Sequence, residues 1–478
     1  MMAEHGVSPS SPADEWTSRD KNPFLYIRDG AVTLPSYQRA YAITIDGDAG
    51  RDFEDFPKHL KSATYLNSIK DPGKSCFWWP RFLYSIVNDA LKPDEFPERI
   101  GWMVELSKWA EVTFDSGGYH VAQGKAHWTG ERLAGTLWLS EEHAQFAIIM
   151  DHPTFTGHPF DACLEETVRN LNWLLDRRKG RCKWINVCQG STVEQVLAWW
   201  AGVRHGNAEG LEGIAYAVLG MSLYLMLWLI RQQIDDGAFD TLERGHGLGR
   251  MKPTDMAVFT MIARVIRKHF NPDFQFTADS AAAFLEAGFL SQFFDGTEDQ
   301  SGKLGSNVFS RLRRRSANSD LAPDTEIFLN SPVYPKGVPI LMSEIGHVYE
   351  DGEQVANRLG MSLLATNNIW HQVTQIISAQ EDVDAVLQLP PYHKFADADA
   401  ADLLIDVANS LKKTGSAESA AAQWVAANQK IKVGGVSLFR HHDMEVFPIL
   451  QEVVEEILVG DKPDFWLKKH KRLLTSWF

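Results

Sequence analysis

One local pattern recurs along the middle of this chain and restricts its fold more than any other feature. Between residues 111 and 280, short apolar runs end in a polar residue or a glycine, and each run is followed by a stretch of helical length, five or six times over. Apolar runs of this kind are typical of buried strands, and their alternation with helices is typical of βα units around a parallel sheet. The sequence therefore predicts an α/β fold.

Two parallel architectures fit this alternation, a (β/α)8 barrel and a doubly wound sheet. A doubly wound sheet binds its ligand at one switch point, commonly after a Gly-x-Gly-x-x-Gly turn, and no such turn follows a predicted strand here. The polar ends occur on many strands instead, as in a barrel whose strands deliver active-site groups to one mouth. We therefore predict a TIM-like (β/α)8 barrel.

The predicted barrel domain spans residues 22–390, with N-terminal strands and inserted loops. Residues 1–21 are polar and rich in Ser and Pro, so we expect a disordered segment. Residues 391–478 are expected to form a divergent helical extension, ending in a packed helix with lysines at its surface. Two further segments, 352–364 and the part of 77–91 beyond Pro80, are predicted to be helical.

Composition restricts the function classes. The net charge of −15 argues against a generally basic nucleic-acid-binding protein but allows a local basic strip. Residues 214–230 form the longest apolar run, which is shorter than the roughly 20 residues of a membrane-spanning helix and is interrupted by Gly220. We expect a strand, a turn and a helix there, and a cytoplasmic protein that does not enter a membrane. The four cysteines lack disulfide or zinc spacing and are expected to be free thiols.

Two acidic residues stand at the ends of predicted strands. Asp115 follows the apolar residues 112–114, and Asp279 follows the alternating aromatics of 273–278. Because the strands of a barrel end at one mouth, two acids far apart in sequence can face one substrate. Alone, Asp115 suits a turn equally well, and Asp279 could cap a helix after it. As a pair they favour acid/base and nucleophilic catalysis by carboxylates.

Taken in order, the predicted strand ends resemble those of the tRNA-guanine transglycosylase superfamily. The family's Asp-Ser-Gly-Gly-Tyr/Phe segment matches residues 115–119, and its next acid matches Asp151. Its Val-Gln-Gly segment resembles 187–190 with one residue inserted, and its Gly-Val-Gly turn resembles 247–249. Its Gly-Gly-Leu turn resembles 219–221 without the first glycine, and its nucleophile motif resembles Asp279-Ser280.

The resemblance implies a role for each group. Asp279 would be the nucleophile that forms a covalent sugar–enzyme intermediate, and Asp115 would be the general acid/base. Tyr119 and His246 would sandwich a flipped base. The residues expected to bind the base are Ser116, Tyr119, Asp151, Gln189, Gly220, Met221, His246 and Gly247.

Simpler structural roles stay open for three of these residues. Asp151 could only begin a turn, Gln189 could satisfy backbone groups, and His246 could be an exposed loop residue. The densest positive run could be a solvated loop or could contact phosphates. Its arginines are Arg311, Arg313, Arg314 and Arg315.

The chain also departs from the family. The family's Cys-x-Cys-x-x-Cys segment has no counterpart after Asp279, and Asn367 stands where a zinc-binding His is expected. We therefore expect no structural zinc and no cofactor. A zinc-less, acidic relative is most similar to the branch, known from phages and some bacteria, that inserts queuosine-related 7-deazaguanine bases such as preQ0 into DNA. A phage-encoded protein would act in the host cytoplasm.

Several alternatives remain at this stage. The polymer could be tRNA instead of DNA, and the protein could need a partner protein or a second copy of itself. A retaining glycoside hydrolase also uses two barrel carboxylates. A non-catalytic barrel subunit that supports a catalytic partner would need neither acid.

Overall fold

The computed structural model of this chain describes the parts of the sequence from which the fold is built. The described residues are 30–37, 79–95, 110–154, 157–217, 220–250, 253–281, 292–298, 312–316, 326–329, 331–332, 337–348, 354–356, 358–387 and 450–475.

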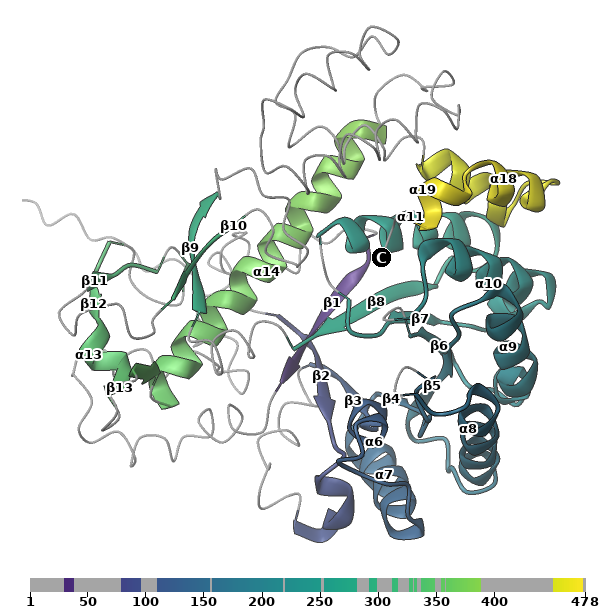
Figure 1. Cartoon of the computed structure of the whole chain (residues 1–478), viewed down its shortest axis with the longest axis horizontal. Helices are drawn as coiled ribbons and strands as arrows, with labels where there is room; N and C mark the ends of the chain where they lie inside the picture. The colour runs from purple at the N-terminus through teal and green to yellow at the C-terminus, as the bar shows by residue number, and fades with distance from the viewer. Residues whose placement is uncertain are drawn as a thin grey trace, which may run out of the picture.

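Eight parallel strands close into a barrel in which each strand pairs with the next in the chain and β8 pairs with β1 (Figure 1). The predicted (β/α)8 fold is confirmed. The strands are β1 Val32–Tyr37, β2 Arg81–Ser85, β3 Glu111–Asp115, β4 Phe146–Ile148, β5 Lys183–Cys188, β6 Gly213–Tyr216, β7 Arg244–Gly247 and β8 Gln275–Ser280.

Helices on the outside of the barrel follow the strands from β3 to β7. They are α7 Gly130–His143, α8 Phe160–Leu175, α9 Val193–Ala208, α10 Leu223–Asp235 and α11 Pro253–His269. Side-chain caps begin three of them: Thr129, Thr192 and Ser222 accept hydrogen bonds from backbone N–H groups three residues on. Such caps satisfy donors that have no partner within the helix, so these residues fix where the helices begin.

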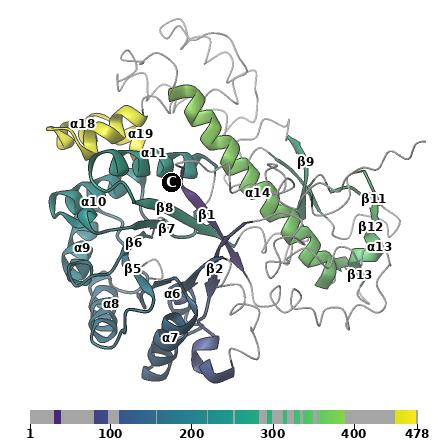
Figure 2. The ribbon, with the colours of Figure 1, turned by 180° about the vertical axis from the view of Figure 1, so that it is seen from behind.

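The place of the helix after β8 is taken by α14 Arg358–Leu387, which packs against α11 and β1. Gln380 of α14 donates a hydrogen bond to the Ala31 carbonyl at 2.6 Å. Figures 1 and 2 show this long helix beside the barrel, with the hairpin of β9 Gln292–Glu298 and β10 Leu312–Ser316 beyond it. The chain between β8 and α14 therefore separates the last strand of the barrel from its outer helix.

Side chains alternate between the two faces of the barrel wall, and on β8 this alternation separates apolar from polar residues. Phe276 points outward and stacks on Phe259 of α11, with ring centroids 4.6 Å apart. Gln275, Thr277 and Asp279 are two residues apart along the strand and face the interior. The interior therefore holds polar side chains at several heights.

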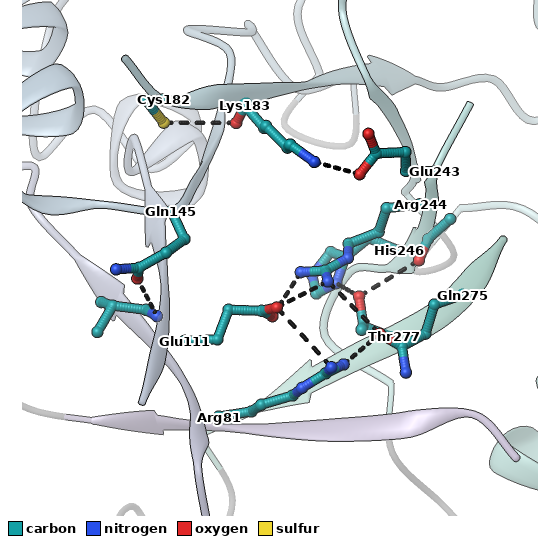
Figure 3. A network of polar contacts seen from close by, with 12 residues as sticks. Arg81, Glu111, Gln145, Cys182, Lys183, Glu243, Arg244, His246, Gln275 and Thr277 are labelled. Atoms are coloured by element: carbon teal, nitrogen blue, oxygen red, sulfur yellow. Dashed lines mark hydrogen bonds and ion pairs between the residues drawn. The ribbon is translucent and has the colours of Figure 1, made fainter. Parts of the chain in front are cut away.

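The N-terminal end of the barrel is closed by a network of charged side chains (Figure 3). Arg244 donates to both carboxylate oxygens of Glu111, at 2.6 and 2.9 Å, and its guanidinium lies 3.5 Å from the centre of the Phe146 ring. Arg81 donates to Gln275 and forms a 3.9 Å ion pair with Glu111. Two arginines thus compensate one partly buried carboxylate, which offsets the cost of removing that charge from water.

The structure corrects two local predictions. The segment after Pro80 is the strand β2 and not a helix. Its residues alternate with period two, with buried Phe82 and Tyr84 on one face and Arg81 on the inward face. Residues 354–356 form the strand β14, and α14 begins only at Arg358. The apolar run 214–230 divides into β6 and α10 as predicted, and none of the helices in the described part is long and apolar enough to cross a membrane.

The described part of the C-terminal extension covers the outer helices. Arg231 of α10 donates to the backbone carbonyls of Ile457, Leu458 and Gly460, and Lys471 lies over the Tyr224 ring at 5.4 Å. The helices α18 Pro463–Lys469 and α19 Lys471–Thr475 bury three leucines and expose their lysines. The predicted packed helix is confirmed, although it is broken into two.

Candidate active site at the C-terminal mouth of the barrel

Asp115 is the last residue of β3, and a glycine turn fixes its position. Gly117 has a φ of 91°, and a Cβ atom there would lie 2.3 Å from the Val87 Cβ, so both the backbone and the space require glycine. The Gly117 N–H donates to Asp115 Oδ1 at 3.2 Å. The short helix α6 Gly118–Ala122 then leads the chain away. The turn therefore holds the carboxyl at the mouth of the barrel.

The surroundings of Asp115 favour its protonated form. Burial raises the pKa of Asp115 above its usual range, the Gly117 N–H lowers it in part, and the negative charge of Asp279 raises it. Because the charge of Asp279 acts on Asp115, the two acids, one on β3 and one on β8, lie near each other at the same mouth. A carboxyl that retains its proton can serve as a general acid.

Asp279 lies on β8 and is held through one of its two oxygens. Its Oδ1 accepts a hydrogen bond from the Gly249 N–H at 2.8 Å and lies 3.2 Å from His246 Nε2. The other imidazole nitrogen of His246, Nδ1, lies 2.8 Å from Thr277 Oγ1. Asp279 is within a strand and not at a helix start, so it does not cap a helix.

A second acid stands next to Asp115 and is paired with an amide. Gln189 Nε2 donates to Asp151 Oδ2 at 2.6 Å, and Gln189 Oε1 accepts from the Thr154 N–H at 2.9 Å. Burial, followed by the charge of Asp115, raises the pKa of Asp151 to about 7. Asp151 and Gln189 therefore form one buried polar unit after β4 and β5, and Gln189 also satisfies a backbone group.

Gly118 brings the Asp115 turn against this unit. A Cβ atom at Gly118 would lie 2.5 Å from Asp151 Oδ1, so a side chain there would displace the carboxylate. Ser116 is buried, and its hydroxyl donates to the Ile149 carbonyl at 2.8 Å, which joins the end of β3 to the end of β4. Ser116 thus supports the position of the neighbouring acids.

The remaining predicted base-binding residues have different environments. The Tyr119 ring is 50% exposed on α6, whereas His246 is fully buried, so His246 is not an exposed loop residue. Met221 is buried, and Gly220 has open space where a Cβ atom would stand. A Cβ atom at Gly247 would meet the Phe259 ring at 2.7 Å, which gives this glycine a packing role against α11. Stacking by Tyr119 and His246 stays a prediction.

The basic run is not part of the described mouth. Arg311 lies outside the described residues, and Arg313, Arg314 and Arg315 lie on β10, for which only the backbone pairing with β9 is described. Their contact with phosphates stays a prediction. Cys163, Cys182 and Cys188 are free, and Cys76 lies outside the described residues.

Sequence reasoning did not identify several residues of the site. Thr277 and Gly249 support Asp279, and Trp128 donates from Nε1 to the Asp151 carbonyl at 2.9 Å. Thr277 had a usable signal, because it lies two residues before Asp279 and so shares its face of β8. Trp128 had none, since its contact depends on how the α6–α7 segment folds.

Fold and site together define a (β/α)8 barrel with three carboxyl groups at the C-terminal mouth, where enzymes of this fold carry their active sites. No protein-family model and no curated protein matches this chain. Within the described ranges, no group of three or more His, Cys, Asp and Glu side chains is placed to hold a metal ion. What the mouth can do is therefore judged from its own chemistry.

Proposed function

We propose that this protein is a base-exchange transglycosylase that replaces guanine in DNA with a 7-deazaguanine derivative. The observation that carries the proposal is that Asp115 and Asp279 have different environments at the same mouth. Burial raises the pKa of Asp115, which suits a proton donor, while Asp279 Oδ1 accepts hydrogen bonds that would orient a nucleophile. An acid and a carboxylate at one mouth are the groups needed to exchange a substituent at C1′ with retained stereochemistry.

The neighbouring polar unit supports a purine as the group exchanged. Guanine presents two adjacent donors, N1–H and the exocyclic amine, and a carboxylate can accept both. Asp151 would accept these hydrogen bonds, with Gln189 orienting its other oxygen. Enzymes reach a base only after it leaves the stack, and the half-exposed Tyr119, four residues after Asp115, would stack on that base.

The choice of DNA rests on the resemblance stated above, with tRNA as the alternative polymer. The test is incorporation of labelled guanine into tRNA, duplex DNA and single-stranded DNA in parallel, with Asp279→Asn as the inactive control. Label in DNA alone supports the proposal, and label in tRNA keeps the chemistry but changes the polymer. No label in any of the three, together with release of reducing sugar from an oligosaccharide, would replace the proposal with a glycoside hydrolase.

A further inference from the structure

His246 is buried beside the acid that we propose as nucleophile, and its ring has two polar contacts and no exposed surface. Nε2 lies 3.2 Å from Asp279 Oδ1, and Nδ1 lies 2.8 Å from Thr277 Oγ1. The residue pairs in register with Thr277 across β7 and β8, so both contacts follow from the strand pairing. A buried imidazole with both nitrogens engaged has a defined tautomer.

The contacts decide which nitrogen carries hydrogen. Asp279 Oδ1 already accepts a hydrogen bond from the Gly249 N–H, so this oxygen acts as an acceptor, and His246 Nε2 must be a donor toward it. The hydroxyl of Thr277 is compatible with this arrangement in either charge state of the ring. It can donate to an unprotonated Nδ1, or accept from Nδ1–H while donating to the Gly245 carbonyl at 3.3 Å. Asp279 therefore places hydrogen on Nε2, and Thr277 holds the ring in position without selecting the tautomer.

The two oxygens of Asp279 are consequently unequal. Oδ1 is fixed by two donors from β7 and the turn after it, whereas Oδ2 has no hydrogen-bond partner among the described residues. The Asp279 side chain is 14% exposed, so solvent or a substrate can reach it. An oxygen with free lone pairs at the mouth is the one able to attack.

We propose that His246 is the positioning residue of Asp279: its Nε2–H and the Gly249 N–H anchor Oδ1, and Oδ2 is the attacking oxygen. This inference rests on the proposed function and deepens it. Thr277 takes part in this arrangement because its hydroxyl contacts Nδ1 and holds the orientation of the ring. The buried imidazole thus acts on the nucleophile and not on the face of the base.

The covalent step then balances as follows. A bond forms between Oδ2 and C1′ while the C1′–N9 bond breaks, and its electron pair goes to N9 of guanine, which takes the proton of the Asp115 carboxyl. In the return step, N9 of the incoming 7-deazaguanine attacks C1′ and gives its proton to Asp115, and the C1′–Oδ2 bond breaks. His246 keeps its hydrogen throughout, so it orients the carboxylate without exchanging a proton with substrate.

The catalytic test uses exchange kinetics of His246→Phe and His246→Gln. Loss of an oriented hydrogen bond to a charged group should lower kcat roughly 10- to 100-fold in the Phe variant, with KM for the base unchanged. The Gln variant keeps an N–H donor and should recover most of the rate. Thr277→Val should lower kcat less, about 3- to 10-fold, because the ring loses only the Nδ1 partner that holds its orientation.

A matched control and a substrate-free measurement make the outcomes decisive. Tyr216→Phe removes a buried hydrogen bond to Gln233 on the outer side of the wall and should leave kcat unchanged.

In NMR of protein labelled with ¹⁵N-histidine, the signals lost in His246→Gln identify the ring. Nε2 should be protonated, and its proton resonance should shift in Asp279→Asn. An unprotonated Nε2, or an unchanged kcat in His246→Phe, would overturn the inference. Absence of exchange in the wild type would instead overturn the proposed function, and the NMR result would still decide whether Oδ1 is anchored.

Discussion

The two ends of the barrel treat buried acids in opposite ways. At the N-terminal end, Glu111 is matched by Arg244 and Arg81. At the C-terminal mouth, Asp115 is partly buried and Asp151 is buried, their hydrogen bonds come from a backbone N–H and an amide, and their like charges repel each other. At the closed end, ion pairs neutralise the charge of the acid and stabilise the fold. At the open end, where a substrate can enter, neighbouring acids repel each other and their pKa values are raised, as is typical of functional sites.

The same difference appears in the expected pH dependence of stability. Burial raises the pKa of Glu111, but the charges of Arg244, Arg81 and Lys183 outweigh it, and the net shift is downward. A lowered pKa in the folded state gives stability that is present above about pH 4.5 and is lost as the pH falls. A raised pKa, as for Asp151, gives stability that is present at low pH and is lost as the pH rises toward 7.

The largest expected effect is a loss of exchange activity at the mouth with no loss of stability. Asp115→Asn removes the general acid, so the exchange rate should fall about 10²- to 10⁴-fold. Because a buried carboxyl is replaced by a neutral amide, the thermal midpoint should stay equal or rise. Exchange assays and calorimetry on the same preparation check this prediction, and a variant that loses stability along with activity would contradict it.

The converse experiment removes an ion pair at the closed N-terminal end and should lower stability without lowering activity. Arg244→Met leaves the partly buried Glu111 without its bidentate partner, so the free energy of unfolding should fall by about 3 kcal/mol, the lower end of the usual cost of removing one member of a buried ion pair. Exchange activity per folded molecule should change little. Urea titrations with activity measured below the transition check the prediction, with Arg181→Met, which breaks an exposed ion pair to Glu142, as the mild control.

A smaller effect sharpens the contrast at the mouth. Asp151→Asn removes a group whose pKa is raised from 3.8 to about 7, so the variant should gain stability relative to wild type as the pH rises from 4 to 8. The gain should reach at most about 4 kcal/mol at pH 8, since one pKa unit corresponds to about 1.4 kcal/mol. In wild type, KM for the base should rise as the pH falls below 7, because only the carboxylate accepts both guanine donors. A pH-independent KM would count against Asp151 as the base-reading group.

Sequence reasoning succeeded where a local pattern determined the outcome. The apolar runs ending at Asp115 and Asp279 identified barrel strands, and the Gly117 turn was visible as Asp-Ser-Gly-Gly. It failed where the pattern was mixed, as in β2, whose Arg81 faces a charged interior that no short window reveals. The Asp279–His246–Thr277 contacts also escaped prediction, because they depend on the register between β7 and β8.

The docking of the C-terminal segment has a consequence for the order in which this protein assembles. Lys268 of α11 forms an ion pair with Glu455, a separation of 187 residues, and Arg231 of α10 reaches Gly460. During synthesis, the outer faces of α10 and α11 therefore stay uncovered while nearly two hundred further residues are made. Uncovered apolar helix surface favours association with other chains. The outer faces of α10 and α11 are thus completed only when residues 450–475 have emerged.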